Sequence, residues 1–190
     1  LESPTTNTDR TLTLPDEAGT VVSTGSTAIV TQTMLATNVA GNCPAFYYGG
    51  AATACANTVA TLITNGAEVF DTNGCYNNTG STVTLNGVSA PAYSFAPNVA
   101  GYYQVTASVF IDGSATDRPG VFIYKNGSVS LSAYSAGTGL SGGQNYQVSG
   151  LISFNGTSDY VQCYYAQASG GSKTTNSNLG YFCGALVRAA

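Results

Sequence analysis

The feature that most constrains the fold is the strict alternation of residues 101–111. Every second position is apolar, and these positions hold Tyr103, Val105, Ala107, Val109 and Ile111. The intervening positions are mostly polar or aromatic. A period of two places successive side chains on opposite faces of a β-strand. The pattern therefore predicts a long strand of an antiparallel sheet, with one face on a core and the other facing outward.

Short β-runs separated by turn signals continue over most of the chain. Asn86-Gly87 and Asn126-Gly127 each join two such runs and predict tight hairpins. Residues 155–158 are predicted to join the runs at 146–154 and 160–167 into a further hairpin. About ten short strands with almost no helical periodicity predict an all-β sandwich or jelly roll.

Composition limits the class of protein. The 190 residues can form one sizeable β-domain with a short extension. Hydrophobic residues make up 43%, but charged residues only 7%, against about a quarter in typical soluble domains. Ser, Thr, Asn and Gly must therefore cover the surface. This composition favours a rigid extracellular or virion protein over a cytosolic enzyme.

Several functions are disfavoured by what the sequence lacks. The net charge is −4 and the five basic residues are scattered, so no basic cluster for nucleic acid is expected. No apolar run approaches the roughly 18 residues that predict a membrane span, so no membrane insertion is expected. With no His to activate a hydroxyl nucleophile, and with Asp112 and Asp117 interpreted as loop residues beside Arg118, we expect no enzymatic activity.

The chain has five cysteines, so at least one cannot pair within it. Cys43 and Cys55 bracket a loop and are the best disulfide candidate, although the sequence leaves this pairing open. Cys163 and Cys183 lie in apolar runs, where a buried thiol acting as a small hydrophobe is the simpler interpretation.

Several phrases resemble known families. The spacing of Phe95, Gly101 and Tyr103 resembles the signature of the complement C1q globular head, which shares its jelly roll with tumour necrosis factor (TNF), although Val105 stands where that pattern has Phe. The wording around it is closer to the C1q-like tips of bacteriophage tail fibres. Similar phrases follow in the same order at 68–73, 124–128, 154–161 and 181–188, and residues 9–20 resemble the linker that precedes such tips.

The resemblance implies a fold and a function. The expected fold is a C1q/TNF-like jelly-roll sandwich of about ten antiparallel strands, homotrimeric, with an N-terminal stalk or linker at 1–40 and the head at 41–190. The expected function is that of a phage tail fibre or spike whose distal domain binds a host surface glycan or outer-surface protein. Its N-terminus would contact other virion proteins, and assembly would take place in the bacterial host cytoplasm. The alternative is a capsid decoration or head-fibre protein without a receptor role.

The resemblance and the loop pattern together suggest site residues. The receptor-binding loop candidates are Asp112, Asp117, Arg118, Tyr134, Gln144, Asn145, Tyr146 and Lys173. Adjacent aromatic pairs place one ring of each pair outward, either at a subunit interface or on a carbohydrate-stacking surface. The trimer-interface candidates are Tyr47, Tyr102, Tyr103, Tyr164 and Phe182. No cofactor is expected, apart from a possible structural calcium at Asp112 and Asp117.

Overall fold

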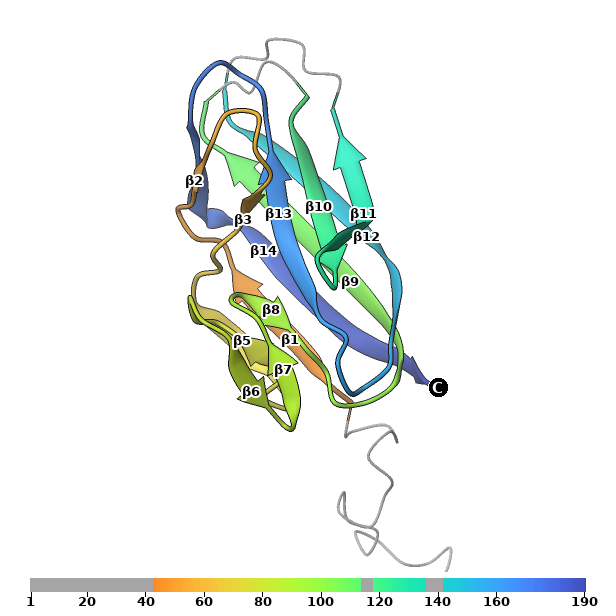
Figure 1. Cartoon of the computed structure of the whole chain (residues 1–190). Coiled ribbons are helices and arrows are strands. Elements are labelled where there is room, and N and C mark those ends of the chain that lie inside the picture. The colour runs from red at the N-terminus through yellow and green to blue at the C-terminus, as the bar shows by residue number, and fades with distance from the viewer. Residues whose placement is uncertain (1–42, 114–117, 136–141) are drawn as a thin grey trace, which may run out of the picture. The chain divides into compact units, whose positions relative to one another are not determined.

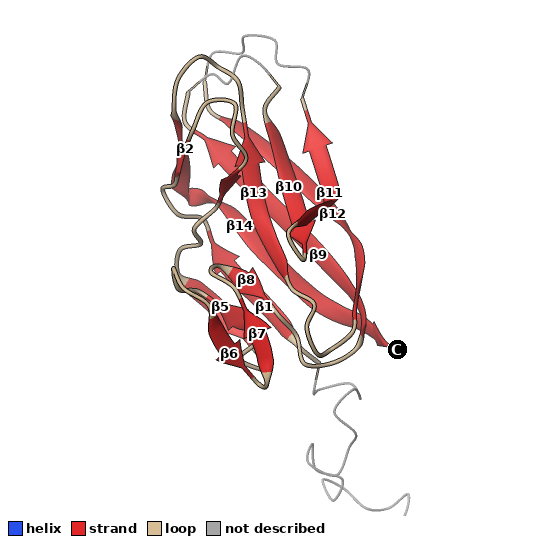
Figure 2. Cartoon of the chain, viewed as in Figure 1, coloured by secondary structure: helices blue, strands red, loops and turns tan. Residues whose placement is uncertain are grey.

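The computed structural model of the chain describes residues 43–113, 118–135 and 142–190, and the predicted stalk at 1–40 lies outside them. The described residues form fourteen strands and contain no helix, hence none that could cross a membrane (Figure 2). The strands are β1 (Ala45–Gly49), β2 (Ala54–Cys55), β3 (Thr61–Leu62), β4 (Glu68–Asp71), β5 (Tyr76–Asn77), β6 (Val83–Leu85), β7 (Val88–Ala90), β8 (Ser94–Phe95), β9 (Gly101–Ile111), β10 (Gly120–Lys125), β11 (Ser128–Tyr134), β12 (Gln144–Phe154), β13 (Val161–Ala166) and β14 (Lys173–Ala189).

Two antiparallel sheets face each other across the core (Figure 1). The first sheet has the order β12-β9-β14-β1-β4, with β2 paired to β14. The second sheet has the order β11-β10-β13-β8-β5, with β3 paired to β13. The hairpin β6-β7 stands apart from both. The long alternating segment is β9, which has both its neighbours in the first sheet, as its length and pattern predicted.

The core is built on aromatic rings contributed by both sheets. Phe46 stacks on Phe95 with ring centroids 4.3 Å apart, and Phe182 meets Phe46 edge-on at 5.0 Å. Tyr103 is fully buried beside Phe154, and its hydroxyl donates to the Val99 carbonyl at 2.8 Å. The assignment of Tyr103 and Phe182 to a trimer interface is therefore wrong, because both rings face the core of their own chain.

Two of the three predicted hairpins are confirmed. Asn86-Gly87 joins β6 to β7, and Asn126-Gly127 joins β10 to β11. Both turns have positive φ at the Asn and at the Gly, which is the type I′ geometry that these dipeptides favour. The third hairpin is wrong: β12 pairs with β9 in the first sheet, whereas β13 pairs with β10 in the second. Residues 155–158 thus cross from one sheet to the other.

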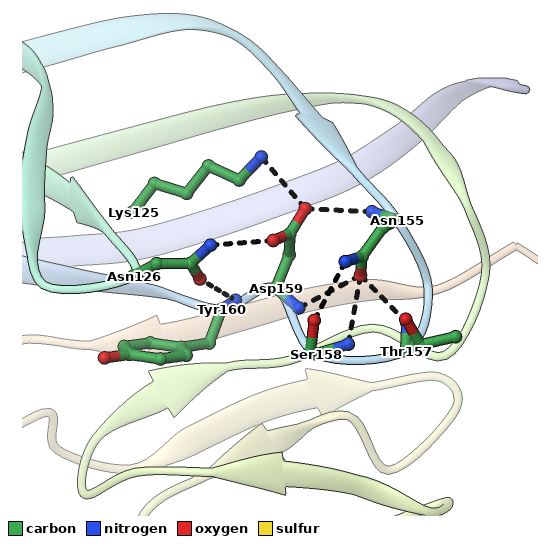
Figure 3. A network of polar contacts seen from close by, with 7 residues as sticks. All are labelled: Lys125, Asn126, Asn155, Thr157, Ser158, Asp159 and Tyr160. Carbon is green, nitrogen blue, oxygen red and sulfur yellow. Dashed lines mark hydrogen bonds and ion pairs between the residues drawn. The ribbon is translucent and has the colours of Figure 1, made fainter.

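A network centred on Asp159 fastens this crossing to the β10–β11 turn (Figure 3). The Asp159 carboxylate accepts from Lys125 Nζ at 2.9 Å, Asn126 Nδ2 at 2.7 Å and the Asn155 backbone amide at 2.9 Å. Asn126 Oδ1 in turn accepts from the Tyr160 amide at 3.0 Å. Burial alone would raise the pKa of Asp159, but the hydrogen bonds from Asn126, Lys125 and Asn155 and the charge on Lys125 hold it below its usual value.

The predicted disulfide between Cys43 and Cys55 is not formed. Cys55 carries a thiol that points toward the Thr53 carbonyl at 3.6 Å, and burial raises the pKa of Cys55 to about 11. Near Cys43, Ala45 pairs with Ala185, whereas Cys55 pairs with Lys173, twelve residues away along β14. Three of these twelve residues are taken up by the irregularity between Thr175 and Gly180, and the remaining nine span roughly 30 Å at about 3.3 Å per strand residue. A disulfide needs Cα atoms within about 7 Å.

Candidate functional site

The outer face of the first sheet is a surface that spans five strands and carries no charge at its centre. It consists of the outward side chains of Tyr47, Phe70, Tyr102, Gln104, Thr106, Ser108, Phe110, Asn145, Gln147, Ser149, Leu151, Tyr181, Cys183 and Ala185. One row of the register crosses all five strands and runs Phe70, Tyr47, Cys183, Thr106 and Ser149. None of these residues is charged, and Arg188 lies at one end of the face beside Tyr102.

Polar side chains on this face bond to one another across the strands. Gln104 Nε2 donates to Ser149 Oγ at 2.7 Å, which also lies 2.6 Å from the Thr106 hydroxyl. Ser108 donates to Asn145 Oδ1 at 2.8 Å, 37 positions further along the chain. Because these groups already have partners, covering them with another surface would leave few polar atoms unsatisfied.

Apolar side chains on the same face are exposed. Leu151 is 61% exposed and Tyr102 is 49% exposed. Next to Tyr47, which stacks on Tyr181 with centroids 5.5 Å apart, an open depression of about 400 Å³ is bordered by Phe110 and Leu179. Burial raises the pKa of Tyr181. Few charged residues and several exposed aromatic rings are typical of the core of a protein–protein interface.

Most of the predicted loop candidates come together at one end of the sandwich. β9 ends just before Asp112, β10 begins just after Arg118, β11 ends at Tyr134, and Gln144 and Lys173 begin β12 and β14. These positions surround the upper end in Figure 1, whereas the start of β1 and the end of β14 lie at the opposite end. The Asp112 carboxylate accepts from Asn176 Nδ2 at 3.0 Å.

Two of the loop candidates are placed elsewhere by the structure. Tyr146 is buried against Tyr165, with ring centroids 5.8 Å apart, so its assignment to a receptor-binding loop is wrong. The Asn145 side chain belongs to the outer face of the first sheet. Asp117 lies outside the described residues, so the calcium site remains a prediction. In the described ranges no group of three His, Cys, Asp or Glu residues is close enough to hold a metal.

The remaining interface candidates do not share one surface. Tyr47 and Tyr102 lie on the outer face of the first sheet, whereas Tyr164 lies on the outer face of the second, opposite Phe122. Sequence reasoning missed Phe70, Tyr181 and Leu151. In the structure Gly184 faces inward, because a Cβ there would come within 2.9 Å of the Phe46 ring. Tyr181, three positions earlier in β14, therefore faces outward.

Comparison with known proteins places this geometry in a fold class. No protein-family model and no curated protein matches the chain. Among solved structures, murine APRIL at pH 5.0 matches with 9% identity and a TM-score of 0.53, over 76% of this chain and 99% of that one. The globular domain of zebrafish complement 1qA matches with 14% identity and 0.53, over 78% and 99%. Eiger TNF from S. frugiperda matches with 7% identity and 0.50, over 78% and 94%.

The described chain is therefore a jelly-roll β-sandwich. More narrowly, it has the fold shared by TNF and the C1q globular head, as the sequence predicted. At these identities the likeness concerns the fold alone.

Proposed function

We propose that this protein is the distal part of a phage tail fibre or spike, which forms a homotrimer and attaches the virion to a host cell surface. The observation that carries the proposal is the uncharged outer face of the first sheet. In the proposed trimer this face packs against neighbouring subunits, and the loop end contacts a host glycan or outer-surface protein. The protein would be part of the virion and assemble in the host cytoplasm.

Burial of the outer face supplies the driving force for self-association. Exposed apolar side chains such as Leu151 and Phe70 each contribute about 1.5–3 kcal/mol when fully buried. The polar groups between them are already hydrogen-bonded within the chain, so their desolvation costs little. One charged residue on this face would make trimer formation far less favourable, because the three subunits would bury three like charges together.

The arrangement of the chain supports attachment at the loop end. The start of β1 lies at the end opposite the loops (Figure 1), and residues 9–20 resemble a fibre linker. A head carried on such a linker would present its loops away from the rest of the particle. Three modest sites on one trimer, repeated over several fibres, would multiply weak binding into firm attachment.

Oligomeric state tests the assembly half of the proposal. Light scattering after size exclusion should give the mass of three chains for the wild type. Gln104→Glu adds one charge to the middle of the face with little change in shape, and Leu151→Glu does so at an exposed position; both should yield monomer. Val59→Glu changes an equally exposed apolar residue (54%) outside the face and should stay trimeric. A monomeric wild type would overturn the proposal.

Cell binding tests the attachment half. Fluorescently labelled protein is incubated with a panel of bacterial strains, and bound strains are then used for phage adsorption in the presence of unlabelled protein. Binding to particular strains, with competition of adsorption, is the expected result. A trimer that binds none of the strains and leaves adsorption unchanged would favour the capsid decoration alternative.

A further inference from the structure

The outer face of the second sheet carries a continuous group of four aromatic rings that the proposed interface does not use. We call Tyr134, Phe122, Tyr124 and Tyr164 the aromatic platform. Phe122 lies 4.9 Å from Tyr134 and 6.3 Å from Tyr124, and Tyr124 lies 4.2 Å from Tyr164, between ring centroids. Their strands β11, β10 and β13 are adjacent in the sheet. Phe122 is only 4% exposed, so the three tyrosines form the part of the platform that a ligand can reach.

Gly120 lets the Tyr134 ring lie across the sheet. Gly120 is the cross-strand partner of Tyr134, and a Cβ on it would come within 2.7 Å of Tyr134 Cδ1 and 3.1 Å of Cε1. The ring thus rests on the Gly120 backbone, as when an aromatic residue covers a strand glycine. Because Tyr134 is 64% exposed, its other side is open to solvent. Gly120 does not have a positive φ, so space requires the glycine: a Cβ would meet the Tyr134 ring most closely and would also come within 3.1 Å of the Ala133 carbonyl oxygen.

The platform offers polar groups that are not otherwise engaged. The hydroxyls of Tyr124, Tyr134 and Tyr164 form no hydrogen bond with any other residue that the structure describes. Burial raises the pKa of Tyr164, and the neighbouring phenols of Tyr124 and Tyr160 raise it further. Each neutral phenol can both donate and accept a hydrogen bond.

Charge is absent from the middle of this surface. The Lys125 side chain points the other way, to Asp159 and over the Phe154 ring at 5.8 Å. The other outward positions of β13 are Gln162 and Ala166, and Gln162 is buried and donates to the Ala92 carbonyl at 2.6 Å. A charged ligand would lose water here without gaining an opposite charge, so a neutral ligand fits best.

We propose that the aromatic platform binds a neutral saccharide, whose C–H face stacks on the rings of Tyr134, Tyr124 and Tyr164. Sugar hydroxyls would exchange hydrogen bonds with the phenols at the rim. The three accessible tyrosine rings offer far less than the roughly 800 Å² that each partner of a protein–protein interface contributes, which favours a sugar chain over a protein. As a mode of host attachment this inference rests on the proposed function, but the binding itself does not.

Binding is measured on the purified full chain with an array of neutral and acidic bacterial surface polysaccharides, followed by titration of those that bind. Tyr134→Ala and Tyr164→Ala should each weaken binding of a neutral polysaccharide about tenfold. Gly120→Ala removes no platform group but displaces the Tyr134 ring, and it should weaken binding several-fold while the melting temperature stays within a few degrees. Val69→Ala, an exposed position on β4 at the edge of the first sheet and outside the platform, should leave binding per folded chain unchanged.

Each outcome separates this inference from the proposed function. The platform proposal is supported if the wild type binds a neutral polysaccharide and both Tyr134→Ala and Gly120→Ala weaken that binding, whether or not cells are bound. The platform proposal is overturned if only acidic polysaccharides bind, if none binds, or if these variants bind as well as wild type. If the Tyr134→Ala variant binds bacterial cells as well as the wild type does, the attachment proposal stands but the platform takes no part in attachment.

Discussion

Replacing Asp159 with Ala should destabilise the fold strongly, because this buried carboxylate joins residues 155–158 to the β10–β11 turn. Its carboxylate holds three donors, from Lys125, Asn126 and the Asn155 backbone, at 2.7–2.9 Å. A hydrogen bond to a charged group contributes about 1.5–3 kcal/mol. The three donors share one carboxylate, and Lys125 is partly exposed, so we expect a total loss of about 3 kcal/mol in unfolding free energy. For a chain of this size, that corresponds to a melting temperature lower by about 6–12 °C.

The matched variant is Lys125→Met, which keeps the long side chain over the Phe154 ring and leaves the other two donors in place. It should cost only about 1 kcal/mol. Thermal unfolding followed by circular dichroism at pH 7, with all proteins at the same concentration because assembly stabilises them, would compare the two. Equal losses of unfolding free energy for Asp159→Ala and Lys125→Met would refute the reasoning. The whole contribution of Asp159 would then come from its ion pair with Lys125.

The pH dependence follows from the lowered pKa of Asp159. The folded state binds the proton less tightly than the unfolded state, so this contribution to stability is full above the unfolded value of about 3.9. It disappears as the pH falls through the lower folded value. Wild type and Asp159→Ala should therefore differ at pH 7 and converge toward pH 2. A difference that stays constant over this range would contradict the assignment.

Further predictions concern buried groups and one turn. Tyr165→Phe removes a buried hydroxyl without a partner and should raise the unfolding free energy by about 1 kcal/mol, whereas Tyr103→Phe loses a hydrogen bond and should lower it by a similar amount, both by chemical denaturation. Gly127→Ala places a Cβ at φ 79° and should cost about 1 kcal/mol, whereas Gly171→Ala, in open space, should be neutral. Cys163 is buried, which raises its pKa, so Ellman's reagent should modify it only after unfolding.

Local patterns in the sequence predicted the local structure well. The alternation in residues 101–111 fixed both the length of β9 and its inward face, and Asn-Gly dipeptides located two type I′ hairpins. Both signals depend only on neighbouring residues: the pleat sets the alternation, and positive φ sets the turn.

Long-range pairing was not predictable in the same way. β12 and β13 are consecutive, and their turn resembles a hairpin turn, but their partners are β9 and β10 in opposite sheets. β2, β3, β5 and β8 have two residues each, too few to show a period. Tyr181 and Phe182 are adjacent, and which of the two faces inward depends on the register of β14 against β1. No local sequence pattern contains that register.

The same limit applied to the candidate site. Tyr102 and Tyr47 were assigned to an interface from their aromatic neighbours alone, and the structure places both on one face. The Tyr164 assignment rested on the same argument, yet its ring belongs to the other sheet. Which sheet a strand joins decides what an outward ring can contact, and that is a property of the topology.

The position of β14 has a consequence for biosynthesis. β14 lies between β9 and β1 and follows every other strand in the sequence. Until residues 173–189 have been made, β1 can pair only with β4, and the first sheet has a gap with two open edges. Those edges could pair with other nascent chains. Folding therefore has to wait for late residues to close contacts far apart in sequence, which is slow, so chaperone demand during synthesis should be high for this domain.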